Sequence, residues 1–149
     1  MANTMKSFIN ESNIPAPLIR AVVKQSGGWD SFQEMARDVA SHGADAGFSG
    51  WIYYTETCDF YKKNKKEIIR LAKNIASELG MDGSARNDFK DHLNFIKSFG
   101  CIRDLGISID ELVQGMSGDG ELQDQIQNCL SWFALEEVAR AYDDYAALD

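Results

Sequence analysis

The sequence predicts an all-α fold, a compact bundle of five to seven helices around a long C-terminal helix, in a single helical domain over residues 1–149. Three observations favour this fold. Apolar residues recur at helical spacing between glycine-rich breaks, both prolines lie beside the first expected helix, and residues 121–147 contain neither glycine nor proline. With 44% hydrophobic residues, the 149-residue chain has enough apolar material for one core.

The first two helices are expected on either side of a glycine pair. One spans residues 17–25, where Pro17 suits a first helical turn because the N–H that it lacks has no partner within a helix. The other spans about residues 30–43, with Asp30 as N-cap and Gln33 reaching back to complete a capping box.

Residues 43–54 break the helical pattern, with three glycines ahead of Trp51-Ile52-Tyr53-Tyr54. This run has the composition of a strand but no partner strand, so a structured loop rich in glycine and aromatic residues is expected. A short helix follows, capped by Thr55 or Thr57, and a second capping pattern predicts a kink or break near Asn64.

The clearest amphipathic helix follows this break and ends at Gly80. A further helix over about residues 89–99 is expected to end at Gly100. Ser108 and Glu111 have the spacing of a capping box, which predicts a short helix beginning there.

The C-terminal segment, residues 121–147, changes its apolar side along its length. One stripe contains Leu122, Ile126, Cys129 and Phe133, and a nearly opposite stripe contains Leu135, Val138, Tyr142 and Tyr145. The helix therefore either lies at the centre of the fold, covered on two sides, or bends between the two stripes.

The net charge of −8 is unevenly distributed along the chain, since residues 1–80 carry +1 and residues 81–149 carry −9. Nucleic-acid binding through the whole surface is disfavoured, because phosphate contacts depend on clustered Lys and Arg, although a local basic patch remains compatible with this charge. The chain has no apolar run long enough to span a bilayer and no secretory signal, so no membrane association and a cytoplasmic location are expected.

The cysteines favour reduced thiols over a disulfide framework. Cys58, Cys101 and Cys129 are odd in number and widely spaced, which suits buried thiols in a reducing compartment. Together with His42 and His92 they offer no pair at the spacing of metal ligands. Neither a metal nor another cofactor is therefore expected.

Two segments are candidate partner-binding surfaces. The first, here called the basic face, consists of five cations that share one side if the helix is continuous: Lys62, Lys63, Lys66, Arg70 and Lys73. The last three share a side even if the helix breaks near Asn64. Such a face can contact phosphate or an acidic protein surface, or it can be a solvated helix side that balances this protein's own acidic half. The second is the aromatic loop with Trp51, Tyr53 and Tyr54, which suits protein recognition or forms a small core that holds the loop.

A catalytic site is the weaker reading. His42, Asp45, Tyr53, Glu56 and Cys58 lie close in sequence and offer groups for acid–base or thiol chemistry. However, His42 fits the end of a helix, where the helix dipole favours the imidazolium. The chain has no nucleophile elbow, kinase signature, zinc-hydrolase motif or phosphate-binding glycine motif, so a non-catalytic protein is expected.

Residues 47–57 (GFSGWIYYTET), 60–66 (FYKKNKK) and 132–141 (WFALEEVARA) resemble small uncharacterised proteins of phages, prophages and plasmids. This resemblance implies an inhibitor of host defence, of the anti-CRISPR or anti-restriction type, that occludes a host protein or nucleoprotein complex. The contact would be made either by the acidic C-terminal half, as a mimic of DNA, or by the aromatic loop and the basic face. One alternative is a small helical nucleic-acid-binding regulator that uses the basic face. Another is an enzyme built around His42 and Cys58. The sequence does not indicate an oligomeric state.

Overall fold

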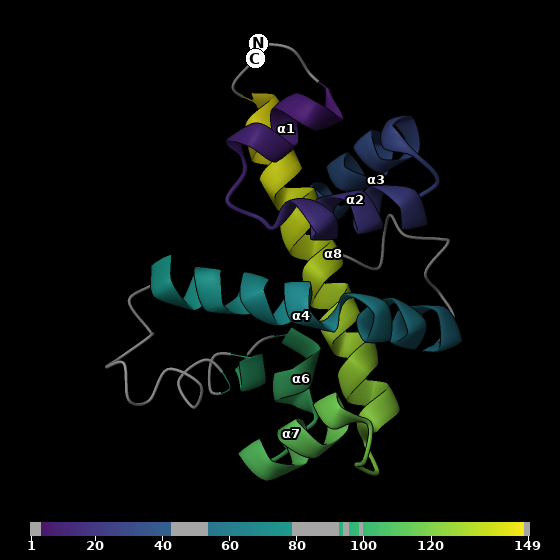
Figure 1. Cartoon of the computed structure of the whole chain (residues 1–149), viewed down its shortest axis with the longest axis vertical. Coiled ribbons are helices and arrows are strands. Elements are labelled where there is room, and N and C mark those ends of the chain that lie inside the picture. The colour runs from purple at the N-terminus through teal and green to yellow at the C-terminus, as the bar shows by residue number, and fades with distance from the viewer. Residues whose placement is uncertain (1–3, 43–53, 79–92, 94–95, 99, 148–149) are drawn as a thin grey trace. The chain divides into compact units, whose positions relative to one another are not determined.

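The computed structural model describes residues 4–42, 54–78, 93, 96–98 and 100–147, and these residues form helices and no strand (Figure 1). The helices are α1 (Met5–Glu11), α2 (Ala16–Gln25), α3 (Trp29–His42), α4 (Tyr54–Glu78), α6 (Gly100–Asp104), α7 (Ile109–Ser117) and α8 (Gln123–Ala147). For this described part of the chain, the predicted all-α class, the number of helices and the long C-terminal helix are confirmed. The loop predicted over residues 43–54 lies outside the described residues, apart from Tyr54.

The chain divides into two compact units, and α8 contributes to both. The terminal unit comprises Met1–Tyr53 and Ala134–Asp149, and the central unit comprises Tyr54–Phe133. The predicted change of apolar side falls at this boundary. The stripe before it buries Ile126, Cys129 and Phe133, and the stripe after it buries Leu135, Val138, Tyr142 and Tyr145. Each part of α8 is therefore buried within its own unit.

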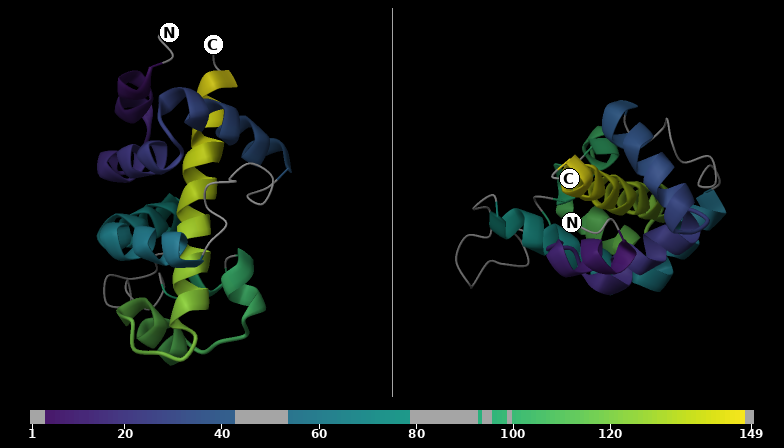
Figure 2. Two further views of the ribbon diagram at one scale, coloured as in Figure 1. Left: turned by 90° about the vertical axis from the view of Figure 1, so that its right-hand side faces the viewer. Right: turned by 90° about the horizontal axis from the view of Figure 1, so that it is seen from above.

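In the terminal unit, α1, α2 and α3 lie with the C-terminal part of α8 around an aromatic cluster (Figure 1, Figure 2). The cluster consists of Phe8, Trp29, Phe32, Tyr142 and Tyr145, and its neighbouring ring centroids are 5.3 to 6.4 Å apart. Gln33 Nε2 donates a hydrogen bond to Tyr142 Oη at 2.7 Å, and Tyr145 Oη donates to Ser7 Oγ at 2.8 Å. The tyrosines thus combine buried rings with satisfied hydroxyl groups.

Two predictions for the N-terminal helices are wrong. The chain begins its helices with α1, in a segment with no predicted helix, where Thr4 Oγ1 accepts a hydrogen bond from the Ser7 N–H at 3.1 Å. In addition, α3 begins at Trp29, so Asp30 lies in the first helical turn and is not the N-cap. Gln33 completes no capping box, because its amide donates to Tyr142. Tertiary packing of the aromatic cluster overrides the local capping pattern.

In the central unit, α4, α6, α7 and the N-terminal part of α8 share a core that is mainly aliphatic and also buries Phe60, Tyr61 and Phe133. Two buried polar groups add specific contacts to it. The Tyr61 hydroxyl on α4 donates to the carbonyl oxygen of Met116 at 3.2 Å, and Gln127 Nε2 on α8 donates to the carbonyl oxygen of Gly115 at 3.1 Å. Both acceptors are on α7, so this short helix is held by α4 and α8 alike.

Helix α4 is kinked at Asn64, as the sequence predicts. Asn64 has φ −120° and ψ 18°, outside the helical region, and its Nδ2 donates to the carbonyl oxygen of Phe60 at 2.9 Å. A side chain that bonds the preceding turn competes with the regular helical hydrogen bonds. Thr55 and Thr57 lie inside α4 and not at its start, so the prediction that either caps a helix is wrong.

For the remaining helices, one predicted helix end is confirmed and another is wrong. Ser108 Oγ accepts from the Glu111 N–H at 3.2 Å, and the Ser108 N–H donates to Glu111 Oε1 at 3.1 Å, so the predicted capping box is confirmed. Gly118 ends α7 with φ +87°, a conformation that glycine adopts at little cost. Gly100, predicted to end a helix, instead begins α6. None of the helices described is both long enough and apolar enough to cross a bilayer.

Candidate functional site

The basic face is solvent-exposed along α4. All five of its cations are exposed, namely Lys62, Lys63, Lys66, Arg70 and Lys73. The same helix buries Ile68, Leu71 and Ala72. Because 3.6 residues complete a helical turn, these apolar side chains point to the opposite side from the three cations that follow the kink. At 1.5 Å per residue the part of the basic face from Lys66 to Lys73 extends over about 11 Å, and the kink at Asn64 separates this part from Lys62 and Lys63.

These cations make no ion pair with any other residue that the structure describes. Described ion pairs lie elsewhere, between Arg103 and Asp104 and between Arg140 and Glu136. Asp59 is exposed one turn before Lys62 and Lys63 without pairing with either. The face therefore keeps a concentrated positive charge in a protein whose net charge is −8. Charges arranged in this way attract anionic partners and accelerate their encounter.

The aromatic loop lies largely outside the residues that the structure describes. Trp51 and Tyr53 lie outside the described residues, and Tyr54 opens α4 with its side chain outside them. Three other aromatic residues near them in sequence are buried in the cores of the two units. Phe32 belongs to the aromatic cluster of the terminal unit, and Phe60 and Tyr61 are buried in the central unit. The contribution of the loop to binding stays a prediction.

The cysteine prediction is wrong for one residue. Cys129 is disulfide-bonded, whereas a free thiol was expected. Widely spaced cysteines carry no sequence signal for pairing, because the fold decides which of them approach each other. Cys58 is buried and forms no disulfide, and its thiol donates to the carbonyl oxygen of Asp124 at 3.5 Å. A buried thiol with a backbone partner suits a structural role.

The proposed acid–base or thiol site is only partly described. His42 ends α3, as the sequence predicts, but its side chain lies outside the described residues, as do Asp45, Tyr53 and the side chain of Glu56. Only Cys58 of this group has a described environment. His92 also lies outside the described part. Among described residues, no group of three His, Cys, Asp or Glu side chains is arranged to hold a metal ion.

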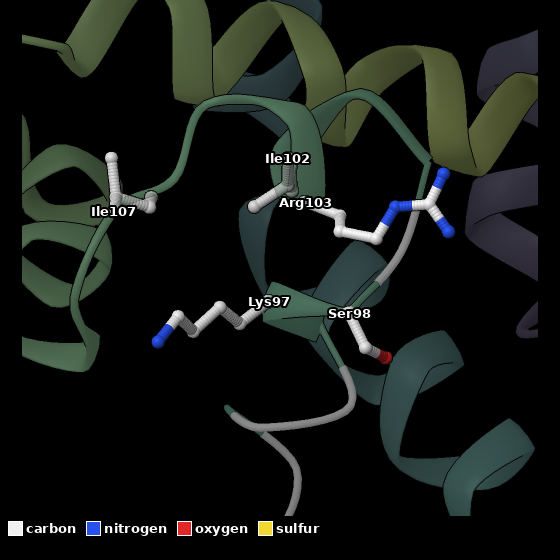
Figure 3. Close-up of a pocket in the computed structure, with 5 residues that line it drawn as sticks. All are labelled: Lys97, Ser98, Ile102, Arg103 and Ile107. Carbon is white, nitrogen blue, oxygen red and sulfur yellow. The ribbon is translucent and has the colours of Figure 1, made fainter.

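The central unit also has a pocket that the sequence analysis did not predict. Its volume is about 240 Å³, and it is lined by Lys97, Ser98, Ile102, Arg103 and Ile107 (Figure 3). Ile102 and Ile107 are buried and form its apolar part, while Arg103 is exposed. No motif marks these residues. The only signal in the sequence is that Lys97 and Arg103 are cations within the acidic half of the chain.

Two buried polar groups in the central unit shape its electrostatics. Burial raises the pKa of the Tyr61 hydroxyl well above its usual value. Gln127 is 1% exposed, and its Oε1 has no hydrogen-bond partner among the described residues. Both residues also bond to backbone carbonyls of α7, so their role is to position this helix.

Comparison with known proteins places the chain in a family. No match was found among curated proteins, and none was found among solved structures. A family model described as a domain of unknown function (DUF7222) matches residues 2–146, which is nearly the whole chain. The protein therefore belongs to the DUF7222 family.

Proposed function

We propose that this protein is a non-catalytic binding protein that inhibits a host defence complex by occlusion, with the basic face of α4 as its contact surface. The single observation that carries the proposal is the exposure of all five cations without an ion pair among the described residues. Had the face balanced the acidic groups that the structure describes, ion pairs between them would be expected. The class of target, a CRISPR or restriction complex, comes from the resemblance to phage and plasmid proteins.

Occlusion needs surface and charge but no reactive group. The basic face provides both on a helix that is anchored by its buried side and by the Tyr61 hydrogen bond to α7. Nucleic-acid-handling complexes present acidic protein surfaces and phosphate, and clustered cations are complementary to either. A rigid helix also needs little ordering when it binds, which favours affinity.

A cleavage assay with a purified CRISPR effector or restriction complex tests this proposal. We expect inhibition to reach completion at a fixed molar ratio of inhibitor to complex and not to deepen with incubation time, because a stoichiometric blocker is consumed by binding. An enzyme would instead inhibit at low molar ratios and progressively with time. Time-dependent inhibition at a small fraction of the complex concentration would overturn the non-catalytic proposal.

Charge reversal locates the surface. We expect Lys66→Glu, Arg70→Glu and Lys73→Glu together to abolish inhibition while the melting temperature stays nearly unchanged, because exposed pairs each contribute only about 0 to 1 kcal/mol. The matched control reverses three exposed cations of the terminal unit: Arg20, Lys24 and Arg37. It changes the net charge by the same amount, so it should retain inhibition. Equal loss in both variants would attribute the effect to net charge and not to the basic face.

Direct nucleic-acid binding is the second candidate, and the same exposed cations favour it. A regulator of this kind binds bare DNA or RNA with an affinity that falls steeply with salt. If all five cations meet phosphate on duplex DNA, the plot of log K against log salt has a slope of about −4.5. An inhibitor of a protein complex shows no such binding to the bare duplex, so an electrophoretic or anisotropy titration separates the two functions.

A further inference from the structure

A second surface of the central unit has the features of a peptide site. The pocket beside α6 combines an apolar part, formed by Ile102 and Ile107, with two cations at its edge (Figure 3). Its volume of about 240 Å³ is below the roughly 300 to 1,000 Å³ typical of small-molecule sites. It is therefore sized for one anchoring side chain rather than for a whole cofactor or substrate.

The two cations flank the apolar part and do not converge on one point. In Figure 3 the side chains of Lys97 and Arg103 extend in different directions from the pocket. A single phosphate or carboxylate between them is therefore not the ligand that this arrangement favours. Two separate carboxylates, one near each cation, fit it better.

The charge at the pocket is not cancelled within the described part of the chain. Lys97 has no ion-pair partner there, and Arg103 has only a contact of 3.7 Å with Asp104. The side chains of Arg103 and Asp104 are 70% and 75% exposed, so water screens this contact and it contributes little. Arg103 remains available to a second carboxylate. The site is locally cationic within the half of the sequence that carries −9.

We propose that this pocket binds an acidic peptide segment of a partner protein, in which one aliphatic side chain enters beside Ile102 and Ile107 and carboxylates on either side contact Lys97 and Arg103. This site goes beyond the proposed function, because no cation of the basic face is among the described residues that line the pocket. The buried isoleucines expose little surface, so the anchor contributes modestly and the flanking charges provide much of the specificity.

The test uses three fluorescently labelled peptides, capped at both ends, and measures anisotropy at low salt. The probe has the sequence Asp-Glu-Leu-Asp-Glu, a second peptide replaces its leucine by alanine, and a third replaces its acids by lysine. We expect the probe to bind with a dissociation constant of about 1 mM or lower. Replacing the leucine by alanine should weaken binding at least about threefold, because alanine buries less apolar surface in the pocket than leucine does. The lysine peptide should show no saturable binding.

Protein variants assign this binding to the pocket. Lys97→Glu with Arg103→Glu should weaken probe binding about tenfold or more, because each reversal replaces attraction by repulsion at an exposed position. Reversal of Lys66, Arg70 and Lys73 on α4 should leave the effect of the leucine intact. If the probe and the alanine peptide bind equally, or if the Lys97 and Arg103 variant binds the probe as the native protein does, the proposal is wrong. Neither result would affect the proposal for the basic face, which its own variants test.

Discussion

Gly115 is the position where one added methyl group tests the packing of α7 on α8 most sharply. A Cβ at Gly115 would lie 2.3 Å from Ile126 Cδ1 and 3.2 Å from Ile126 Cβ and Cγ1. Ile126 is fully buried, so its Cδ1 cannot avoid the new methyl group by turning into solvent. Gly115→Ala gains about 0.5 to 1 kcal/mol from helix propensity, but overpacking a core costs about 1 to 3 kcal/mol. The midpoints of these two ranges leave an expected net loss of about 1 kcal/mol.

Ile126→Val identifies the atom responsible, because it removes only Cδ1. Alone it should cost about 0.5 to 1.5 kcal/mol. In the Gly115→Ala background it should cost nothing or restore stability, which gives a coupling energy of about 1 kcal/mol or more. Urea denaturation followed by circular dichroism measures all four proteins, with Gln114→Ala as a control at an exposed site on the same helix. Additive effects, or a Gly115→Ala protein as stable as the native one, would refute this account of α7 and α8.

Three further results are expected. Burial raises the pKa of Tyr61, so the unfolded tyrosine loses its proton near pH 10 while the folded one keeps it. The free energy of unfolding should therefore fall as the pH rises above about 10. Tyr61→Phe should reduce this fall. Phe8→Ala should cost about 3 to 5 kcal/mol by opening the aromatic cluster. Tyr142→Phe should cost about 0.5 to 1.5 kcal/mol, because it keeps the ring and loses the hydrogen bond from Gln33. Ser108→Ala should cost about 1 kcal/mol through loss of the capping box, and thermal melts that show no cost would contradict it.

Local sequence patterns predicted the features that depend on neighbouring residues. The capping box at Ser108, the end of α3 near residue 43 and the kink at Asn64 each follow from side chains within four residues of the backbone that they affect. The two apolar stripes of α8 could also be predicted, because the spacing of apolar residues within a single segment shows which of them share a side of the helix. These predictions needed no knowledge of tertiary contacts.

Features decided by distant residues were missed or misassigned. Gln33 has the spacing of a capping residue, yet it bonds Tyr142, which lies more than one hundred positions away in the sequence. The disulfide of Cys129 depends on the fold and not on spacing. The pocket beside α6 is lined by both Lys97 and Ile107, and no sequence motif predicts that these two residues lie near each other. Three cations of the basic face, Lys66, Arg70 and Lys73, were by contrast predictable as neighbours, because they follow one helical period after the kink at Asn64.

The central claim is that the basic face of α4 contacts the partner of this protein. The most direct measurement is the plating efficiency of a phage on cells that carry an active CRISPR or restriction system and express the protein, compared between the native chain and its Lys66→Glu, Arg70→Glu, Lys73→Glu variant. The account predicts that the native protein raises plating efficiency, that the variant does not, and that both melt at nearly the same temperature. Full protection by a variant that is folded and expressed to the same level would contradict it.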